Sequence, residues 1–306
     1  MTTVYTSDIF NSHVTPPGHP ERVDRLHAVR AALEGIEGLD HREAPVGAEA
    51  DIERCHPQRY IDRVRAAIPD DGWVSLDGDT HVTAGSWDAA IRGVGANVAA
   101  VEAVLTGDTK NAFVACRPPG HHAERETAMG FCLFGNVAIA AQRALDEVDR
   151  VAIIDFDVHH GNGTQDLVWN EERVLFASTH QMPLYPGTGA PDERGAHDNV
   201  VNVPLNPGTG GAAMRQAYEG LVLPAVRAFA PEMILISAGF DAHANDPLAN
   251  LMWTEDDFTW VTRAICDLAD DVAGGRVVST LEGGYDLDAL GASAAAHVRV
   301  LNERGG

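Results

Sequence analysis

The chain has 306 residues, of which 45% are hydrophobic and 22% charged, so it carries enough apolar side chains for a large folded core. Its 45 acidic residues outnumber 22 basic ones, and the net charge of −23 argues against direct nucleic-acid binding, because such a surface repels phosphate backbones. No apolar run approaches the roughly 18 residues of a membrane helix, and the N-terminus lacks the pattern of a signal peptide. We therefore expect a cytoplasmic protein without membrane contact, and its four scattered cysteines predict buried free thiols.

Apolar strand-like runs and helical spacings alternate along the chain. We expect strands at 4–5, 112–116, 151–154, 174–178, 233–237 and 276–281. We expect helices near 23–36, 55–68, 87–105, 136–145, 211–229, 254–273 and 286–302. This alternation predicts an α/β fold with a central, mostly parallel β-sheet flanked by helices on both faces. Because no linker, repeat or low-complexity stretch divides the chain, residues 1–306 are expected to form a single domain.

Polar residues follow the expected strands at their carboxyl ends, where open α/β sheets bind ligands. Each strand delivers a different group, in the order His121-His122, then Asp155, Asp157 and His159, then Asp241, then Gly283-Gly284-Tyr285. Taken alone, each has a structural explanation, such as a helix cap, a solvated turn or a buried histidine. Four successive strands that carry such groups to one edge indicate a functional site.

Convergence of Asp157, His159 and Asp241 would give three protein ligands and an open position, which is typical of a catalytic metal site. A metal there polarises a carbonyl and lowers the pKa of a water to about 7. The His121-His122 pair could take the proton of this water and pass it to a leaving amine. The Tyr285 hydroxyl could stabilise the developing oxyanion. These residues predict metal-assisted hydrolysis of an amide or ester.

Seven motifs occur in order along the chain: His19–Arg22, Arg117–Ala123, Gly130–Cys132, Asp155–Gly163, Tyr185–Gly189, Ser237–Ala242 and Glu282–Tyr285. Together they resemble the histone deacetylase family, including its bacterial amidohydrolase members, over nearly the whole chain. The resemblance implies one catalytic domain with the arginase/deacetylase fold and an active site at the carboxyl ends of the strands. It also implies zinc-dependent removal of an acetyl or short acyl group from an amine such as acetyl-lysine.

The same resemblance implies a role for each matching residue. Zinc would lie on Asp157, His159 and Asp241, with iron(II) or cobalt(II) as alternatives. His122 would be the main general base and acid, His121 with Asp155 would assist electrostatically, and Tyr285 would polarise the acetyl carbonyl. Gly130, Phe131 and Tyr185 would form a narrow tunnel, and Asp79 would hold substrate amides. A structural potassium ion would bind Asp155 and Ser178, and Arg22 would lie near the acetate exit path.

Two positions bear on the basicity of His122 and on the class of substrate. Asn162 stands where one branch of the family carries Asp, so the partner of His122 is neutral and should leave it less basic. Leu248 is apolar where polyamine-selective relatives carry a glutamate, which favours an acyl-lysine or a small neutral amide. We therefore expect a small-molecule or peptide acetylated amine as the substrate, and a homo-oligomer is left open.

Three alternatives compete with this interpretation. An acetylpolyamine deacetylase remains open, as does a catalytically silent metal-holding binding protein, although the tandem histidines and Tyr285 are all present. A binuclear manganese ureohydrolase needs further carboxylates, and this chain has Gly161 and His243 at the corresponding positions.

Overall fold

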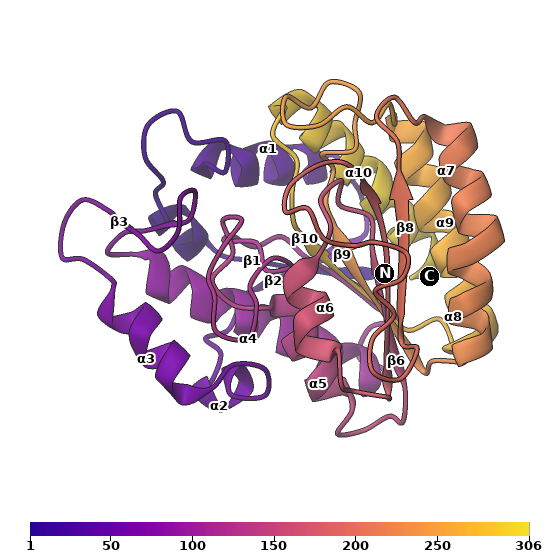
Figure 1. The fold of residues 1–306 in the computed structure, drawn as a ribbon, viewed down its shortest axis with the longest axis horizontal. Coiled ribbons are helices and arrows are strands. Elements are labelled where there is room, and N and C mark those ends of the chain that lie inside the picture. Colours follow the sequence, from indigo (N-terminus) through magenta and orange to yellow (C-terminus); the bar gives the residue numbers. More distant parts are fainter. Residues whose placement is uncertain (306) are drawn as a thin grey trace.

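The computed structural model describes residues 1–305, and its centre is an eight-stranded sheet with the order β2-β1-β5-β10-β9-β6-β7-β8 (Figure 1). The strands are β1 (Thr2–Thr6), β2 (Leu39–Glu43), β5 (Asn111–Val114), β6 (Val151–Asp155), β7 (Val174–Gln181), β8 (Val200–Leu205), β9 (Met233–Ala238) and β10 (Val277–Leu281). All neighbouring strands of this sheet run parallel, which confirms the predicted central sheet. A separate antiparallel pair joins β3 (Val74–Ser75) to β4 (His81–Val82).

The inner strands are apolar because helices cover both faces of the sheet. Every residue of β5, β6, β7, β9 and β10 is buried, as expected for parallel strands without a solvent face. The edge strands β2 and β8 were not expected from the sequence. β2 is largely polar and partly exposed, and β8 contains Pro204, so neither shows the apolar run of an inner strand.

Within residues 1–305, ten α-helices form two layers around this sheet (Figure 1). They are α1 (Val23–Leu33), α2 (Glu49–Ile52), α3 (Gln58–Ala66), α4 (Ser86–Leu105), α5 (Asn136–Ala144), α6 (Asn162–Val168), α7 (Gly211–Ala217), α8 (Leu223–Phe229), α9 (Glu255–Val272) and α10 (Leu287–Arg304). Helices α1, α10, α9 and α8 pack in sequence against one another, whereas α4, α5 and α6 pack together in the other layer. The helix expected at 211–229 is divided by a π-helical turn at Tyr218–Val222.

Two further expectations can be compared with the described residues. All four cysteines are buried and free, as the sequence predicts. Among residues 1–305, no helix combines the length and the apolar character needed to cross a membrane. The loops that leave the carboxyl ends of β5, β6, β9 and β10 carry the candidate site.

Candidate active site

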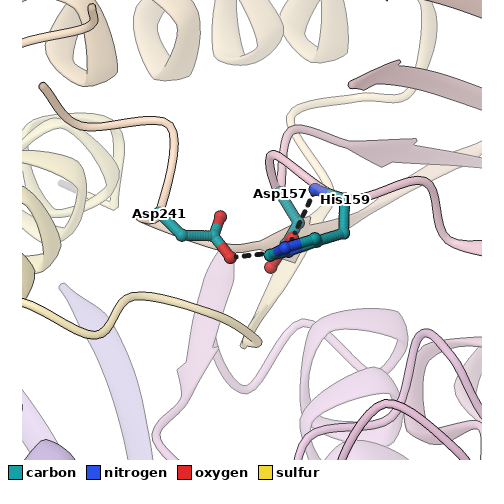
Figure 2. Close-up of side chains that lie close together, drawn as sticks. All are labelled: Asp157, His159 and Asp241. Carbon is teal, nitrogen blue, oxygen red and sulfur yellow. Dashed lines mark hydrogen bonds and ion pairs between the residues drawn. The ribbon is translucent and has the colours of Figure 1, made fainter. Parts of the chain in front are cut away.

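The loops after β6 and β9 bring Asp157, His159 and Asp241 into one buried cluster (Figure 2). Each residue offers one ligand atom, and these atoms all lie within 4.8 Å of one another. Nδ1 of His159 lies 3.1 Å from Asp157 Oδ1 and 3.1 Å from Asp241 Oδ2, so this ring nitrogen faces both carboxylates. Two carboxylates and one imidazole are a donor set that fits zinc, and that iron(II) or cobalt(II) would also accept.

Backbone N–H groups orient the two carboxylates of this cluster. Val158 N–H donates to Asp241 Oδ1 and Gly283 N–H donates to Asp157 Oδ2, each at 2.8 Å. A Cβ atom on Gly283 would collide with both carboxylates, so the close approach of the backbone requires glycine there. The ligands are thus held in place before any metal binds.

The cluster is electrostatically strained without a cation. Burial and the neighbouring charge of Asp157 raise the pKa of Asp241 to about 7. Burial opposes a charged His159, but hydrogen bonds to Asp157 and Asp241 raise its pKa to about 10. In the metal-free protein a proton on His159 therefore offsets part of the negative charge of the two carboxylates. A bound metal cation would offset this charge in its place.

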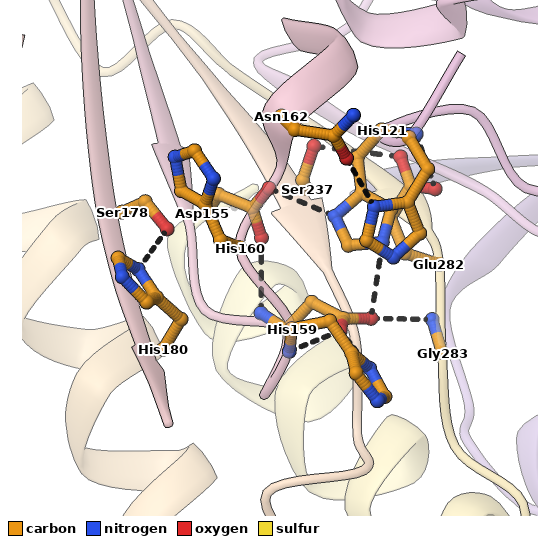
Figure 3. A network of polar contacts seen from close by, with 12 residues as sticks. His121, Asp155, His159, His160, Asn162, Ser178, His180, Ser237, Glu282 and Gly283 are labelled. Atoms are coloured by element: carbon orange, nitrogen blue, oxygen red, sulfur yellow. Dashed lines mark hydrogen bonds and ion pairs between the residues drawn. The ribbon is translucent and has the colours of Figure 1, made fainter. Parts of the chain in front are cut away.

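The loop after β5 places His121 and His122 side by side, with ring centroids 4.0 Å apart. His121 Nδ1 lies 3.0 Å from Asp155 Oδ2 in the network shown in Figure 3. Burial opposes a charged His121, but the charges of Asp157 and Asp155 raise its pKa well above the ordinary value. His121 is therefore a cation held between carboxylates.

His122 has the opposite protonation state. Burial, followed by the charges of His121 and His159, lowers the pKa of His122 well below its ordinary value. Its Nδ1 lies 2.7 Å from Asn162 Oδ1, and Asn162 Nδ2 donates to Glu124 Oε1 at 2.8 Å. This second bond turns the amide oxygen toward His122, so Nδ1 carries the proton and Nε2 is free to accept one.

A cavity of about 260 Å³ opens above these groups. Its lining comprises Asp79, His122, Gly130, Phe131, His159, Leu184, Tyr185, Leu248 and Tyr285. All five residues that the sequence predicted as substrate-binding therefore lie together with His122, His159 and Tyr285. Aromatic rings form much of the wall, with Phe131 5.9 Å from Tyr285 and Tyr185 5.2 Å from His122 between centroids.

The Phe131 side of the wall depends on an unusual turn. Gly130 and Phe131 have φ angles of 54° and 69°, and this left-handed conformation costs about 1–3 kcal/mol for a residue such as Phe. Asp79 Oδ1 accepts the Gly130 N–H at 3.2 Å, and Thr80 Oγ1 accepts the Phe131 N–H at 3.0 Å. Thr80 was missed in the sequence, where only its position beside Asp79 could have indicated it.

Tyr285 completes the site from the loop after β10. Its N–H donates to Asp246 Oδ2 at 2.7 Å, and burial raises its phenol pKa well above the ordinary value, so the hydroxyl keeps its proton. The guanidinium of Arg25 lies 4.9 Å from the Tyr285 ring centroid. Asp246 was not identified from the sequence, because its role arises only through this tertiary contact.

The expectation that Arg22 lies near an acetate exit path stays a prediction. Arg22 precedes α1, its side chain is 51% exposed, and it pairs with Asp24 at 3.3 Å. Arg25, in the first turn of α1, is buried instead and donates to the carbonyl oxygens of Glu282 and Gly284 at 2.5 Å each. The i, i+4 spacing of Glu21 and Arg25, which form an ion pair at 3.1 Å, was the available signal.

The residues predicted to bind potassium are neighbours on adjacent strands, since Asp155 pairs with Ser178 across β6 and β7. Both are fully buried. Ser178 Oγ lies 2.9 Å from His180 Nδ1, and Asp155 Oδ1 accepts the Asp157 N–H at 3.0 Å. A potassium ion at this position stays a prediction.

Comparison with known proteins shows that this chain is similar to deacetylases. The histone deacetylase domain family matches residues 19–301. A histone deacetylase-like amidohydrolase from Pseudomonas aeruginosa is 42% identical over 286 residues, covering 89% of this chain and 74% of that protein. A probable deacetylase from Archaeoglobus fulgidus is 37% identical over 298 residues, covering 94% of this chain and 82% of that protein. The crystal structure of the HDA15 HD domain superposes with a TM-score of 0.93 at 35% identity, covering 99% of this chain and 88% of that one.

Proposed function

The chain belongs to the histone deacetylase family of deacetylases and amidohydrolases, and from this premise we propose that it is a zinc-dependent enzyme that removes an acetyl or short acyl group from acyl-lysine. The observation that carries the proposal is the cavity itself. A buried set of zinc-type ligands reaches this cavity through His159, and the neutral imidazole of His122 and the protonated phenol of Tyr285 also line it.

Asp157, His159 and Asp241 would hold the zinc, which when bound supplies Lewis-acid polarisation of the acyl carbonyl and a more acidic water. Nε2 of His122 then takes the proton of the attacking water and later delivers it to the leaving amine. The Tyr285 hydroxyl donates a hydrogen bond to the oxygen on which negative charge develops. The His121 cation, held by Asp155, adds positive charge beside this reaction.

The pocket favours a slender, uncharged acyl-lysine chain over an acetylpolyamine. Phe131 and Tyr185 provide aromatic walls for methylene groups, and Leu248 adds an apolar side chain at 37% exposure. Asp79 is the single carboxylate among the lining residues, and it also accepts the Gly130 N–H. A polyamine carries further ammonium groups, and a pocket lined by one carboxylate offers them too few ion-pair partners. Asp79 can instead accept hydrogen bonds from the main-chain N–H groups of a peptide.

The test compares the zinc-loaded protein on an acetyl-lysine peptide and on acetylputrescine, beside the variants Tyr285→Phe and Tyr5→Phe. We expect faster turnover of the peptide. Loss of the phenol hydroxyl in Tyr285→Phe should lower kcat about 100-fold or more with KM little changed, as for other oxyanion donors. Tyr5→Phe is the matched control. The Tyr5 hydroxyl lies 3.4 Å from Ala99 O, and Tyr5 is not among the residues that line the pocket.

Preference for acetylputrescine would contradict the substrate assignment while leaving the chemistry in place. Full activity of Tyr285→Phe would contradict the role of the phenol. No turnover of either substrate with metal bound would contradict the proposed function.

A further inference from the structure

Glu282 lies directly after β10, and the reaction described above gives it no role. Its side chain is fully buried. Burial raises its pKa to about 7, because a charged carboxylate is poorly solvated in the protein interior. Keeping a carboxylate in such a place costs free energy, so the contacts that it makes there are informative.

The Glu282 carboxylate binds main-chain groups of the loop that carries the tandem histidines. Oε2 accepts the Gly120 N–H at 2.7 Å and the His121 N–H at 3.2 Å, while Oε1 lies 3.4 Å from Ser237 Oγ. Figure 3 shows Glu282 beside His121 in this network. The next N–H along, that of His122, donates to the weak acceptor Cys132 Sγ at 3.4 Å. The carboxylate is therefore a principal anchor of this loop.

The same short segment also contacts the metal ligands and ends in the phenol. Gly283 N–H donates to Asp157 Oδ2 at 2.8 Å, and Tyr285 follows two residues later. Arg25 holds the carbonyl oxygens on either side of Gly283 at 2.5 Å each. One short segment thus touches the histidine loop and a metal carboxylate and carries the oxyanion donor.

We propose that Glu282 is a positioning residue that fixes the main chain of His121 so that the neighbouring His122 ring stays in place beside the rings of His159 and Tyr185. The inference rests on the proposed function, because Glu282 would support the loop that carries the proton-transfer residue His122. The carboxylate acts as a hydrogen-bond acceptor in this role, and its charge is not required. Because Glu282 is not among the residues that line the cavity, its loss alters kcat and leaves KM nearly unchanged.

Two variants separate acceptor geometry from charge. Glu282→Leu removes both acceptor oxygens at similar size, and we expect kcat to fall about 10- to 100-fold with KM within about twofold, since small displacements of catalytic groups have large effects. Glu282→Gln keeps one side-chain oxygen for Gly120 and His121 and turns its amide toward the Ser237 hydroxyl. We expect Glu282→Gln to retain kcat within about threefold.

Hydrogen exchange of the Gly120 and His121 amides gives a readout that does not depend on turnover. Both amides should be protected in the wild type and in Glu282→Gln, and should exchange faster in Glu282→Leu. Ile265→Val, which removes one buried methyl group from α9, controls for a general loss of stability and should change neither the exchange nor kcat.

Unchanged amide exchange in Glu282→Leu would overturn the proposal, as would a Glu282→Gln enzyme as slow as Glu282→Leu, which would show that charge is the requirement. A rise in KM with kcat preserved would also overturn it. A wild-type protein without turnover would refute the proposed function instead, and the exchange measurement would still decide whether Glu282 anchors this loop.

Discussion

The partner of His122 sets the pH range in which this residue can act as a base. Asn162 is neutral, and burial together with the nearby charge of His121 lowers the pKa of His122 well below its ordinary value. The neutral imidazole that accepts a proton is therefore available even in mildly acidic solution. An Asp at position 162 would favour the imidazolium and raise the pKa of His122.

We therefore expect Asn162→Asp to move the acidic limb of the kcat/KM profile upward by about one pH unit or more, because the base must be unprotonated to act. Activity at pH 6 should fall relative to activity at pH 8. Since Asn162 Nδ2 donates to Glu124, the double variant with Glu124→Gln restores a donor to the new carboxylate. An acidic limb that stays in place in both variants would show that another group limits the rate.

At the scale of elements, the loop 182–193 carries Leu184 and Tyr185 to the cavity and is fastened at its far end. His180 Nε2 lies 3.0 Å from Gly189 O, and His160 Nδ1 lies 2.8 Å from Thr188 Oγ1. Glu193 accepts the Gly189 N–H at 3.1 Å and the Ala190 N–H at 3.0 Å. These contacts hold the loop against β7 and the metal-ligand segment.

Two glycines of this loop allow a matched comparison. Gly187 and Gly189 have φ angles of 89° and 91°, so alanine strains both about equally. A Cβ at Gly189 would also collide with His180 and His160, whereas a Cβ at Gly187 meets nothing within 4 Å. We expect Gly189→Ala to displace Tyr185 and raise KM several-fold more than Gly187→Ala does. Steady-state kinetics on the acetyl-lysine peptide measures this difference, and equal KM values would contradict it.

The inner strands and the site edge could be predicted because burial on both faces makes β5, β6, β9 and β10 continuous apolar runs. Parallel strands then bring the polar groups at their carboxyl ends to one edge without further information. The edge strands β2 and β8 lack this pattern, since each has one neighbour and tolerates polar residues or proline.

Contacts between distant segments could not be read from the sequence in the same way. Asp246 gains its role only where its carboxylate meets the Tyr285 N–H, and Glu124 only where it meets Asn162. The distinction between Arg22 and Arg25 depends on which side of α1 faces the sheet, a difference of less than one helical turn. Local patterns locate the residues that do chemistry, whereas tertiary packing decides which residues support them.

At the scale of the whole molecule, a chain with a net charge of −23 buries several carboxylates at one end of its sheet. Asp155, Asp157, Asp241 and Glu282 are all fully buried there. Self-repulsion of this charge opposes folding, and a divalent cation at Asp157, His159 and Asp241 would relieve it. Metal binding and folding stability should therefore be linked in this protein.

The sign of this linkage follows from the pKa values. Burial raises the pKa of Asp241 from 3.8 and of Glu282 from 4.5 to about 7 in each case. Between about pH 4 and 7 these two carboxyl groups thus bind more protons in the metal-free folded state than in the unfolded chain, so their contribution to stability falls as the pH rises through this window. Zinc requires deprotonated ligands, so its affinity for the folded protein increases as the pH rises.

We therefore expect the Tm difference between zinc-loaded and chelator-treated protein to be larger at pH 8 than at pH 6. Zinc at 100 times its Kd adds about 2.7 kcal/mol to the free energy of unfolding, which raises Tm by several degrees in a chain of this size. Thermal unfolding at both pH values, with and without chelator, measures the difference. Asp241→Asn should nearly abolish it at either pH, because the variant removes a ligand without changing the size of the side chain. A Tm difference that stays constant or shrinks as the pH rises would place zinc binding outside this carboxylate cluster.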